Sequence, residues 1–289
     1  AGDSGNGGSS TVGTYQINTG NEIEVPFSGW GAGTWGQGTW GNGGTTLAGM
    51  RLWSQSNFGE DLFFVHRNGA LYYWDASSGV TTRGVLVSSL GGAAQVPTVA
   101  NIAFVSDVFR FAFCFGVNAV GSSALDPMLL RWSDQEDIAD WNPTATNQAG
   151  SLSLSEGTEI VQAIQARQEV LVWTDSAMYG LQYLGAPLVW GATLLGSNIT
   201  IASPNAAVYS NNIAYWMGTS KFYYYDGTVK TLPCSVRSYV FDDFNSDQAQ
   251  QVICGSNEEF DEIWWFYCSS GVTRNDRYVV YNYVENIWY

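Results

Sequence analysis

The chain of 289 residues is predicted to be an all-β protein, and three observations support this fold class. Aromatic residues make up 15% of the chain and charged residues 13%, about half of the usual ~25%, so there is ample apolar surface for a core. Short segments rich in aromatic and β-branched side chains follow one another with polar turns between them, as strands do. Segments with the 3.6-residue periodicity of an amphipathic helix are nearly absent, which predicts very little helix.

The N-terminal part of the chain differs in composition from the rest. Residues 1–13 contain Gly and Ser with almost no apolar side chains, and we predict a flexible arm there. In the Gly/Trp-rich segment 14–50, Trp30, Trp35 and Trp40 recur every five residues, a period of neither helix nor strand. Because indole rings need an apolar environment, we predict that these tryptophans insert into another subunit. The alternatives are contacts with their own domain and a carbohydrate-stacking platform.

Residues 51–289 are predicted to form repeated β-hairpins. Strands at 61–67 and 70–75 are joined by Asn68-Gly69, a pair that favours a type I′ turn with positive φ at both positions. These hairpins continue along the whole segment, so we treat it as one domain.

The later hairpins resemble the first. The strand at 109–115 has one aromatic face, since every second residue is Phe, and further hairpins are predicted at 170–179, 213–225 and 263–281. Comparable positions in successive units, spaced 57, 49, 45 and 57 residues apart, are Tyr73, Leu130, Tyr179, Tyr224 and Tyr281. Four-stranded units recurring at about 40–50 residues are typical of a β-propeller. We therefore predict a propeller of irregular four-stranded blades, with a β-sandwich as the alternative. The apolar ending at 287–289 leaves open that the chain is part of a longer protein and the propeller incomplete.

Composition excludes several classes of function. The chain has 26 acidic and 11 basic residues, a net charge of −15, whereas phosphate binding depends on clustered Lys and Arg. A phosphate-neutralising nucleic-acid binder and a basic membrane-surface protein are therefore excluded. No run of 18 apolar residues occurs, so no membrane-spanning segment is expected.

The sequence carries no motif for catalysis. His66 is the single histidine, and we predict a structural role for it. Acidic clusters at 134–137, 242–243 and 258–262 are expected to be solvated loop acids, with a glycosidase acid pair or a calcium site that includes Asp247 as alternatives. We predict no catalytic residue, no metal ligand and no cofactor, and thus not an enzyme.

Scattered motifs resemble a known family. They are RLWS (51–54), FGEDL (58–62), NG with LYYWD (68–75), RWSD (131–134), DWNP (140–143), LVWTD (171–175) and YLG (183–185). Together they are similar to the tail tubular protein B, or nozzle, family of short-tailed bacteriophages, over roughly Arg51 to Trp288. This resemblance implies a virion structural protein of the tail, assembled in the host cytoplasm as a ring, usually a homohexamer, below the portal and adaptor. Its partners would be these and other tail proteins, and genomic DNA would pass through the channel during ejection without specific binding.

The physical features are compatible with such a ring. Aromatic surfaces of low charge suit permanent subunit contacts, and a net negative charge discourages adhesion of DNA. This electrostatic hypothesis fails if Arg51, Arg110 and Arg131 line the channel of the ring. The alternative function is a carbohydrate-binding or receptor-binding propeller of a phage tail, used in host attachment. Tryptophans buried between blades or subunits favour the structural function, whereas two or more in one open pocket beside a carboxylate pair favour glycan binding.

Overall fold

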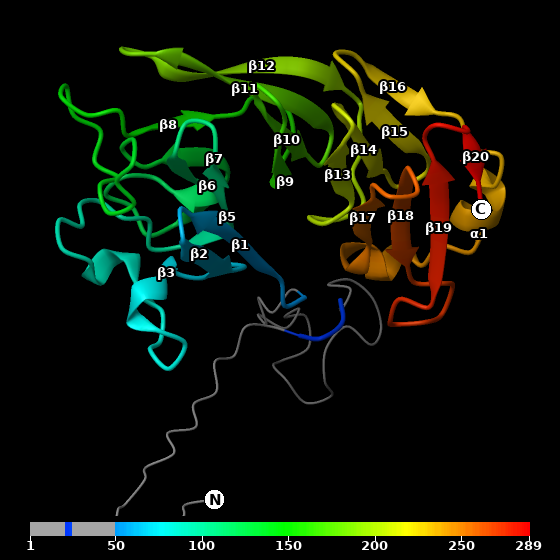
Figure 1. Cartoon of the computed structure of the whole chain (residues 1–289), viewed down its shortest axis with the longest axis horizontal. Helices are drawn as coiled ribbons and strands as arrows, with labels where there is room; N and C mark the ends of the chain where they lie inside the picture. The colour runs from blue at the N-terminus through cyan, green and yellow to red at the C-terminus, as the bar shows by residue number, and fades with distance from the viewer. Residues whose placement is uncertain (1–20, 25–49) are drawn as a thin grey trace, which may run out of the picture.

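The computed structural model describes residues 21–24 and 50–289, and this part of the chain consists mainly of β-strands (Figure 1). Its strands form five sheets, each of four antiparallel strands that are consecutive in sequence. The predicted arm at 1–13 and the predicted contact residues Trp30, Trp35 and Trp40 lie outside the described residues.

The elements have the following bounds. The first sheet contains β1 (Trp53–Phe58), β2 (Asp61–His66), β3 (Tyr72–Trp74) and β4 (Val85–Leu86). The second contains β5 (Ala100–Ser106), β6 (Phe111–Asn118), β7 (Leu125–Trp132) and β8 (Gly150–Ser153). The third contains β9 (Ile160–Gln165), β10 (Val170–Thr174), β11 (Ala177–Gly185) and β12 (Val189–Ser197). The fourth contains β13 (Ala207–Ser210), β14 (Ile213–Met217), β15 (Phe222–Tyr225) and β16 (Val229–Leu232). The fifth contains β17 (Ile253–Asn257), β18 (Glu262–Tyr267), β19 (Arg277–Asn282) and β20 (Ile287–Trp288).

Helical structure is limited to short elements in the described chain, as predicted. They are the α-helix α1 (Arg237–Asp242) and 3-10 turns at Ala76–Ser78, Val87–Ser89 and Ser246–Gln251.

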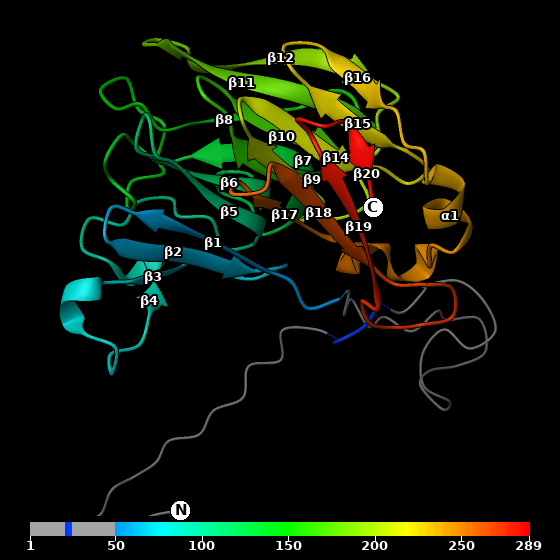
Figure 2. The ribbon, with the colours of Figure 1, turned by 45° about the vertical axis from the view of Figure 1, so that its right-hand side comes forward.

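The five sheets follow one another around a common centre, with the first strand of each sheet innermost (Figures 1 and 2). Along the ring, β1 contacts β5, β5 contacts β9, β9 contacts β13, and β13 contacts β17. This arrangement is a β-propeller with four-stranded blades, which confirms the predicted fold class. The five positions used to define the repeat all lie in the third strand of their sheets, in β3, β7, β11, β15 and β19.

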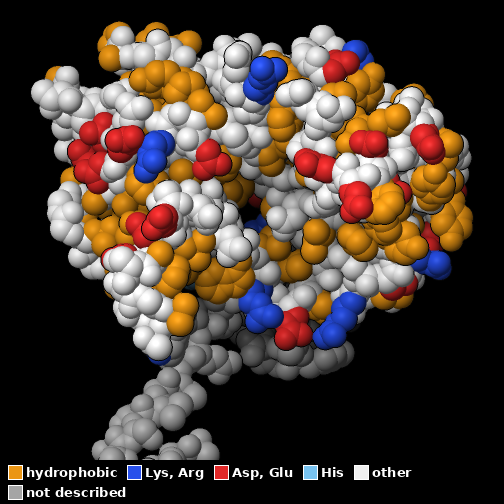
Figure 3. Space-filling model, viewed as in Figure 1, with side chains coloured by type: hydrophobic (Ala, Val, Ile, Leu, Met, Phe, Trp, Pro, Cys, Tyr) orange, Lys and Arg blue, Asp and Glu red, His pale blue; other side chains and the backbone are white. Residues whose placement is uncertain are grey.

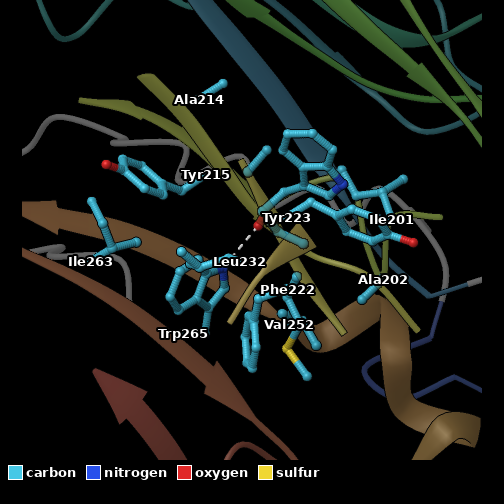
Figure 4. Packing of buried hydrophobic residues seen from close by; sticks show 14 of the residues in the cluster. Ile201, Ala202, Ala214, Tyr215, Phe222, Tyr223, Leu232, Val252, Ile263 and Trp265 are labelled. Carbon is cyan, nitrogen blue, oxygen red and sulfur yellow. Dashed lines mark hydrogen bonds between the residues drawn. The ribbon is translucent and has the colours of Figure 1, made fainter. Parts of the chain in front are cut away.

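Apolar clusters lie between neighbouring sheets, because the two faces of one strand contribute to different clusters. In β6, Phe111 and Phe113 belong to a cluster shared with the third sheet, while Ala112 and Cys114 belong to one shared with the first. The predicted aromatic face of this strand is therefore confirmed, and its other face is also buried. The largest cluster joins the third, fourth and fifth sheets. Figure 4 shows part of this cluster around Trp265. The indole Nε1 of buried Trp265, in β18, donates to the carbonyl of Ala206, just before β13.

The prediction of a type I′ turn at Asn68-Gly69 is wrong. Asn68 has a φ of 59°, but Gly69 does not adopt a positive φ. The reason is a contact with the second sheet, since the Gly69 carbonyl accepts a hydrogen bond of 2.9 Å from the Ala100 N–H. An added Cβ at Gly69 would also lie 2.4 Å from the His66 ring, so glycine is required there for close packing.

Candidate functional site: the central cavity and its polar bridges

A cavity of about 410 Å³ lies at the centre of the propeller, where the space-filling view shows a hollow (Figure 3). Its wall comes from the inner strands β1, β5 and β9, from Arg67 after β2, and from the turn before β13. The polar side chains in the wall are Ser54, Gln55, Arg67, Asn101, Glu159, Gln162 and Asn205. The volume is within the range of about 300–1,000 Å³ that is usual for small-molecule sites. It is far too small for duplex DNA, whose major groove alone is about 12 Å wide.

Several of these polar side chains join neighbouring sheets. Ser54 of β1 exchanges two hydrogen bonds with the backbone of Ala103 in β5, at 2.6 and 3.0 Å. Gln162 of β9 does the same with the backbone of Ala207 in β13, at 3.1 and 3.0 Å. The inner strands belong to separate sheets and do not pair through their backbones. These side chains satisfy the backbone N–H and carbonyl groups of the neighbouring inner strand instead.

The other junctions have bridges of the same kind. Between the second and third sheets, the Ser106 hydroxyl donates to Gln165 Oε1 at 3.0 Å. Between the fourth and fifth sheets, buried Ser203 before β13 donates to the Val252 carbonyl at 2.5 Å. The inner rim of the propeller is therefore held by specific side-chain hydrogen bonds at each junction between consecutive sheets.

Arg67 is the cationic side chain of the cavity wall. Its Nη2 donates to Gln250 Oε1 at 2.7 Å, which connects the first sheet to the segment before β17. Burial lowers the pKa of Arg67, while the negative charges of Glu159 and Glu24 oppose this effect. Burial also raises the pKa of Glu24, against the effect of its hydrogen bond from the Gln250 N–H. The cavity wall thus carries one cationic and one acidic side chain, Arg67 and Glu159.

His66 has a structural environment, as predicted. Its Nδ1 lies 3.1 Å from the Arg67 carbonyl, and its ring packs edge-on against Trp53 with centroids 5.7 Å apart. No group of three or more His, Cys, Asp or Glu side chains within residues 21–24 and 50–289 is placed to hold a metal ion.

The acidic cluster at 134–137 organises a loop. Asp134 Oδ1 accepts hydrogen bonds from the backbone N–H groups of Gln135 and Gln148, at 2.9 and 2.7 Å. Nearby, Asp140 accepts from Asn142 and Asn147. These carboxylates are therefore bound to the protein's own donors, and their role is more specific than that of the solvated loop acids expected from the sequence.

The tryptophans of the described chain mostly fill the core. Of the ten tryptophans at positions 53–288, seven are buried, namely Trp132, Trp141, Trp173, Trp190, Trp216, Trp265 and Trp288. The central cavity contains one tryptophan, Trp53, and one carboxylate, Glu159. It therefore lacks the combination of several tryptophans and a carboxylate pair that would favour glycan binding.

The arginines of the electrostatic hypothesis have different environments. Arg131 is 1% exposed, so it cannot line a channel between subunits. Arg51 and Arg110 lie on the surface and form ion pairs with Glu22 and Glu136, at 3.8 and 3.4 Å.

A second depression, of about 420 Å³, lies at the turns of the third and fourth sheets. Tyr209, Tyr225, Glu169 and Asp226 contribute to it. The Tyr225 hydroxyl donates to Glu169 Oε1 at 3.0 Å, and burial followed by this bond raises the pKa of Tyr225 to about 12. Asp226 forms an ion pair of 2.7 Å with Lys230.

The bridging residues were not identified from the sequence. Ser54, Gln162 and Ser203 contact partners 45 to 49 residues away. Ser54 is the last residue of the RLWS motif, whereas no local motif marks Gln162 or Ser203. The available signal is weak: Gln162 is a polar residue in a mostly apolar strand, but Ser54 lies in a strand with several other polar residues and Ser203 lies in the turn before β13.

Comparisons with known proteins give limited similarity. No family model matches the chain, and no curated protein matches it. Among solved structures, an extracellular domain from B. thetaiotaomicron aligns with a TM-score of 0.49 and 10% identity, covering 83% of this chain and 27% of that chain. Hsv2 of Kluyveromyces lactis aligns with a TM-score of 0.43 and 9% identity, covering 82% of this chain and 61% of that one. Hsv2 of K. marxianus gives 0.45 and 6%, with 82% and 59% covered. The chain thus spans about a quarter of the first structure and about three fifths of the Hsv2 chains.

None of the helices in the described ranges is long and apolar enough to cross a membrane.

Proposed function

We propose that this propeller is a structural protein of a bacteriophage tail, a subunit of the nozzle ring below the portal and adaptor. The observation that carries the proposal is the placement of the tryptophans, most of which fill cores between blades. A protein that uses its aromatic residues in this way, around a small central cavity, has the features of a rigid assembly subunit.

The motifs behind the family resemblance have structural roles in this chain. Arg131, from RWSD, donates to the backbone carbonyl of Trp141, from DWNP, at 3.0 Å. The Trp141 indole in turn donates to the Ile138 carbonyl at 2.8 Å, and both side chains are buried. Motifs of this type stabilise a blade and its loop. We expect a family of structural proteins to retain motifs with such a role.

In this proposal the DNA passes between copies of the protein, because the cavity of one propeller is too small for a duplex. The net charge of −15 would let DNA slide through the ring without specific binding. Trp30, Trp35 and Trp40 are the proposed contacts between neighbouring copies of a homohexamer.

Light scattering of the purified protein, with negative-stain images, tests the proposal. We expect a ring with a mass about six times the 31.5 kDa of one chain. Trp35→Ala should lower the assembled fraction without changing the urea midpoint of the blades, whereas Phe260→Ala, at an exposed turn, should leave both unchanged. A monomer at all concentrations, in the presence and absence of portal and adaptor proteins, would contradict the nozzle function.

A second candidate is a carbohydrate-binding or receptor-binding propeller of the tail. The depression at Tyr209 and Tyr225 favours it, because aromatic rings beside carboxylates are the groups that bind sugars. A glycan array with the wild-type chain tests this function. Specific binding that is lost in Tyr225→Ala and kept in Tyr239→Ala, at an exposed site on α1, would support it.

A further inference from the structure

The central cavity carries two opposite charges that do not pair with each other directly. Arg67 and Glu159 both line it, and the negative charge of Glu159 acts on the pKa of Arg67, so the two groups lie within electrostatic range. Among residues 21–24 and 50–289, no ion pair includes either of them. The guanidinium and the carboxylate are therefore near each other in one cavity, but farther apart than the partners of an ion pair.

Arg67 is held in place by the protein while most of its donors stay unused. Its backbone N–H donates to the Leu52 carbonyl at 2.9 Å, and its Nη2 donates to Gln250 Oε1 at 2.7 Å. A guanidinium has five N–H donors, and the bond to Gln250 is the only side-chain hydrogen bond of Arg67 within the described ranges. The other donors can bind a ligand carboxylate in the planar, two-bond arrangement for which arginine is suited.

Glu159, just before β9, is an acceptor without a donor. Its backbone carbonyl accepts from the Asp175 N–H at 3.1 Å, but no residue of the described chain donates to its carboxylate. The neighbouring acid differs, because the Asp175 carboxylate accepts from the N–H and the hydroxyl of Thr158, at 2.7 Å each. An ammonium group of a ligand would supply the donors that Glu159 lacks.

The rest of the cavity wall offers apolar contacts and free amides. Accessible apolar side chains in it include Leu52, Trp53, Ile102, Phe104 and Pro204. The side-chain amides of Gln55 and Asn205 also line the cavity, and neither is hydrogen-bonded to another residue of the described chain. A wall that is largely apolar, with a few polar groups placed in it, is typical of small-molecule sites.

We infer that the central cavity binds a small zwitterion, of the class of the apolar α-amino acids, with its carboxylate on Arg67 and its ammonium group on Glu159. A simple anion would face the negative charges of Glu159 and of nearby Glu24, whereas a simple cation would face Arg67. A zwitterion complements both signs in one molecule, and charges that leave water are tolerated when they are paired and hydrogen-bonded. The inference concerns a ligand and does not depend on the proposed function.

Isothermal titration calorimetry of the purified chain with L-leucine, L-phenylalanine and L-methionine is the first test. We expect saturable binding of at least one of them, with a Kd below about 1 mM. The N-acetyl derivative of the best ligand lacks the ammonium charge, and its carboxamide derivative lacks the carboxylate. Each should bind at least about tenfold more weakly, since each loses a charge-assisted contact. The inference is overturned if none of the three amino acids binds, or if either derivative binds as tightly as the amino acid.

Variants connect each charge of the ligand with one side chain. Glu159→Gln should reduce the preference for the amino acid over its N-acetyl derivative from at least about tenfold to less than about threefold. Glu156→Gln, at an exposed glutamate outside the cavity wall, is the matched control and should leave this preference unchanged. An unchanged preference in Glu159→Gln would overturn the inference.

Arg67→Gln should in the same way reduce the preference for the amino acid over its carboxamide, and an unchanged preference would again overturn the inference. This variant also loses the hydrogen bond to Gln250, so its urea midpoint is measured beside its affinity. The Glu159 carboxylate accepts no hydrogen bond within the described chain, and Glu159→Gln should keep the wild-type midpoint. The test with Glu159→Gln therefore stays decisive even if Arg67→Gln does not fold.

Discussion

The buried guanidinium of Arg131 offers the sharpest test of how the blades are held. This side chain of β7 is 1% exposed and donates to three backbone carbonyls, those of Asn118, Gln95 and Trp141, at 3.2, 2.6 and 3.0 Å. The three carbonyls lie at the end of β6, in the loop before β5 and in the loop after β7. One side chain thus fixes two loops to the second sheet, and burial lowers its pKa.

Arg131→Met retains much of the side-chain volume and removes all three hydrogen bonds. A net loss of about 1 kcal/mol per bond, with a larger cost for each carbonyl that stays buried and unpaired, predicts destabilisation of about 3–5 kcal/mol. This is a large part of the roughly 5–15 kcal/mol that stabilises a typical domain. The stability of Arg131→Lys should lie between those of the wild type and of Arg131→Met, because an ammonium group cannot match the fork geometry of a guanidinium.

Equilibrium unfolding in urea, followed by tryptophan fluorescence, measures the effect. Arg110→Met is the matched control, because that side chain is 51% exposed and its ion pair with Glu136 is at the surface. Its free energy of unfolding should change by less than about 0.5 kcal/mol. If Arg131→Met changed the stability no more than Arg110→Met, the role assigned to the three bonds would be refuted.

Three further predictions concern pH and packing. Burial raises the pKa of Cys234 and of Cys268 from 9.0 to about 11, so between these pH values the folded state keeps protons that the unfolded state releases. The free energy of unfolding should therefore be constant below pH 9 and fall between pH 9 and 11. A series of urea unfolding curves in which it rises over this range would contradict the prediction. Gln162→Leu leaves the N–H and carbonyl of Ala207 without partners and should lower the free energy of unfolding by about 2–3 kcal/mol. An unchanged urea midpoint would show that this bridge does not stabilise the junction of β9 and β13. Gly69→Ala places a Cβ against the His66 ring and should cost about 1–3 kcal/mol by thermal unfolding. His66→Ala should restore part of that loss in the double variant, and an additive double-mutant cycle would contradict the steric explanation.

The repeat could be predicted from the sequence because each unit has a local pattern of residues. An aromatic strand, a polar turn and a second strand can each be recognised within ten residues, and Tyr73, Tyr179 and Tyr224 mark equivalent third strands. The irregular spacing also has a local cause: the interval of 57 residues from Tyr224 to Tyr281 includes the 20 residues between β16 and β17, which contain α1 and a 3-10 turn.

The features that the sequence did not reveal depend on contacts between blades. The Asn68-Gly69 turn follows local preference at its first position only, because pairing with Ala100 sets the second. The bridges made by Ser54 and Gln162 become visible only when inner strands are placed side by side, since polar residues of these types are common in loops and turns. The prediction for Trp30, Trp35 and Trp40 concerns a segment outside the described residues and stays a prediction.

The sharing of apolar clusters has a consequence for how such a molecule can change in evolution or by design. Leu171 and Trp173 of β10 contribute to one cluster, while Val170 and Val172 contribute to another. This blade therefore shares each of its two apolar cores with a neighbouring blade. Deleting an internal blade would uncover two cores at once and require two unlike faces to match. Adding or removing a blade at the end of the series changes only one interface. Propellers of this design should therefore differ in blade number through changes next to the first or the last sheet, while the internal order of blades stays fixed.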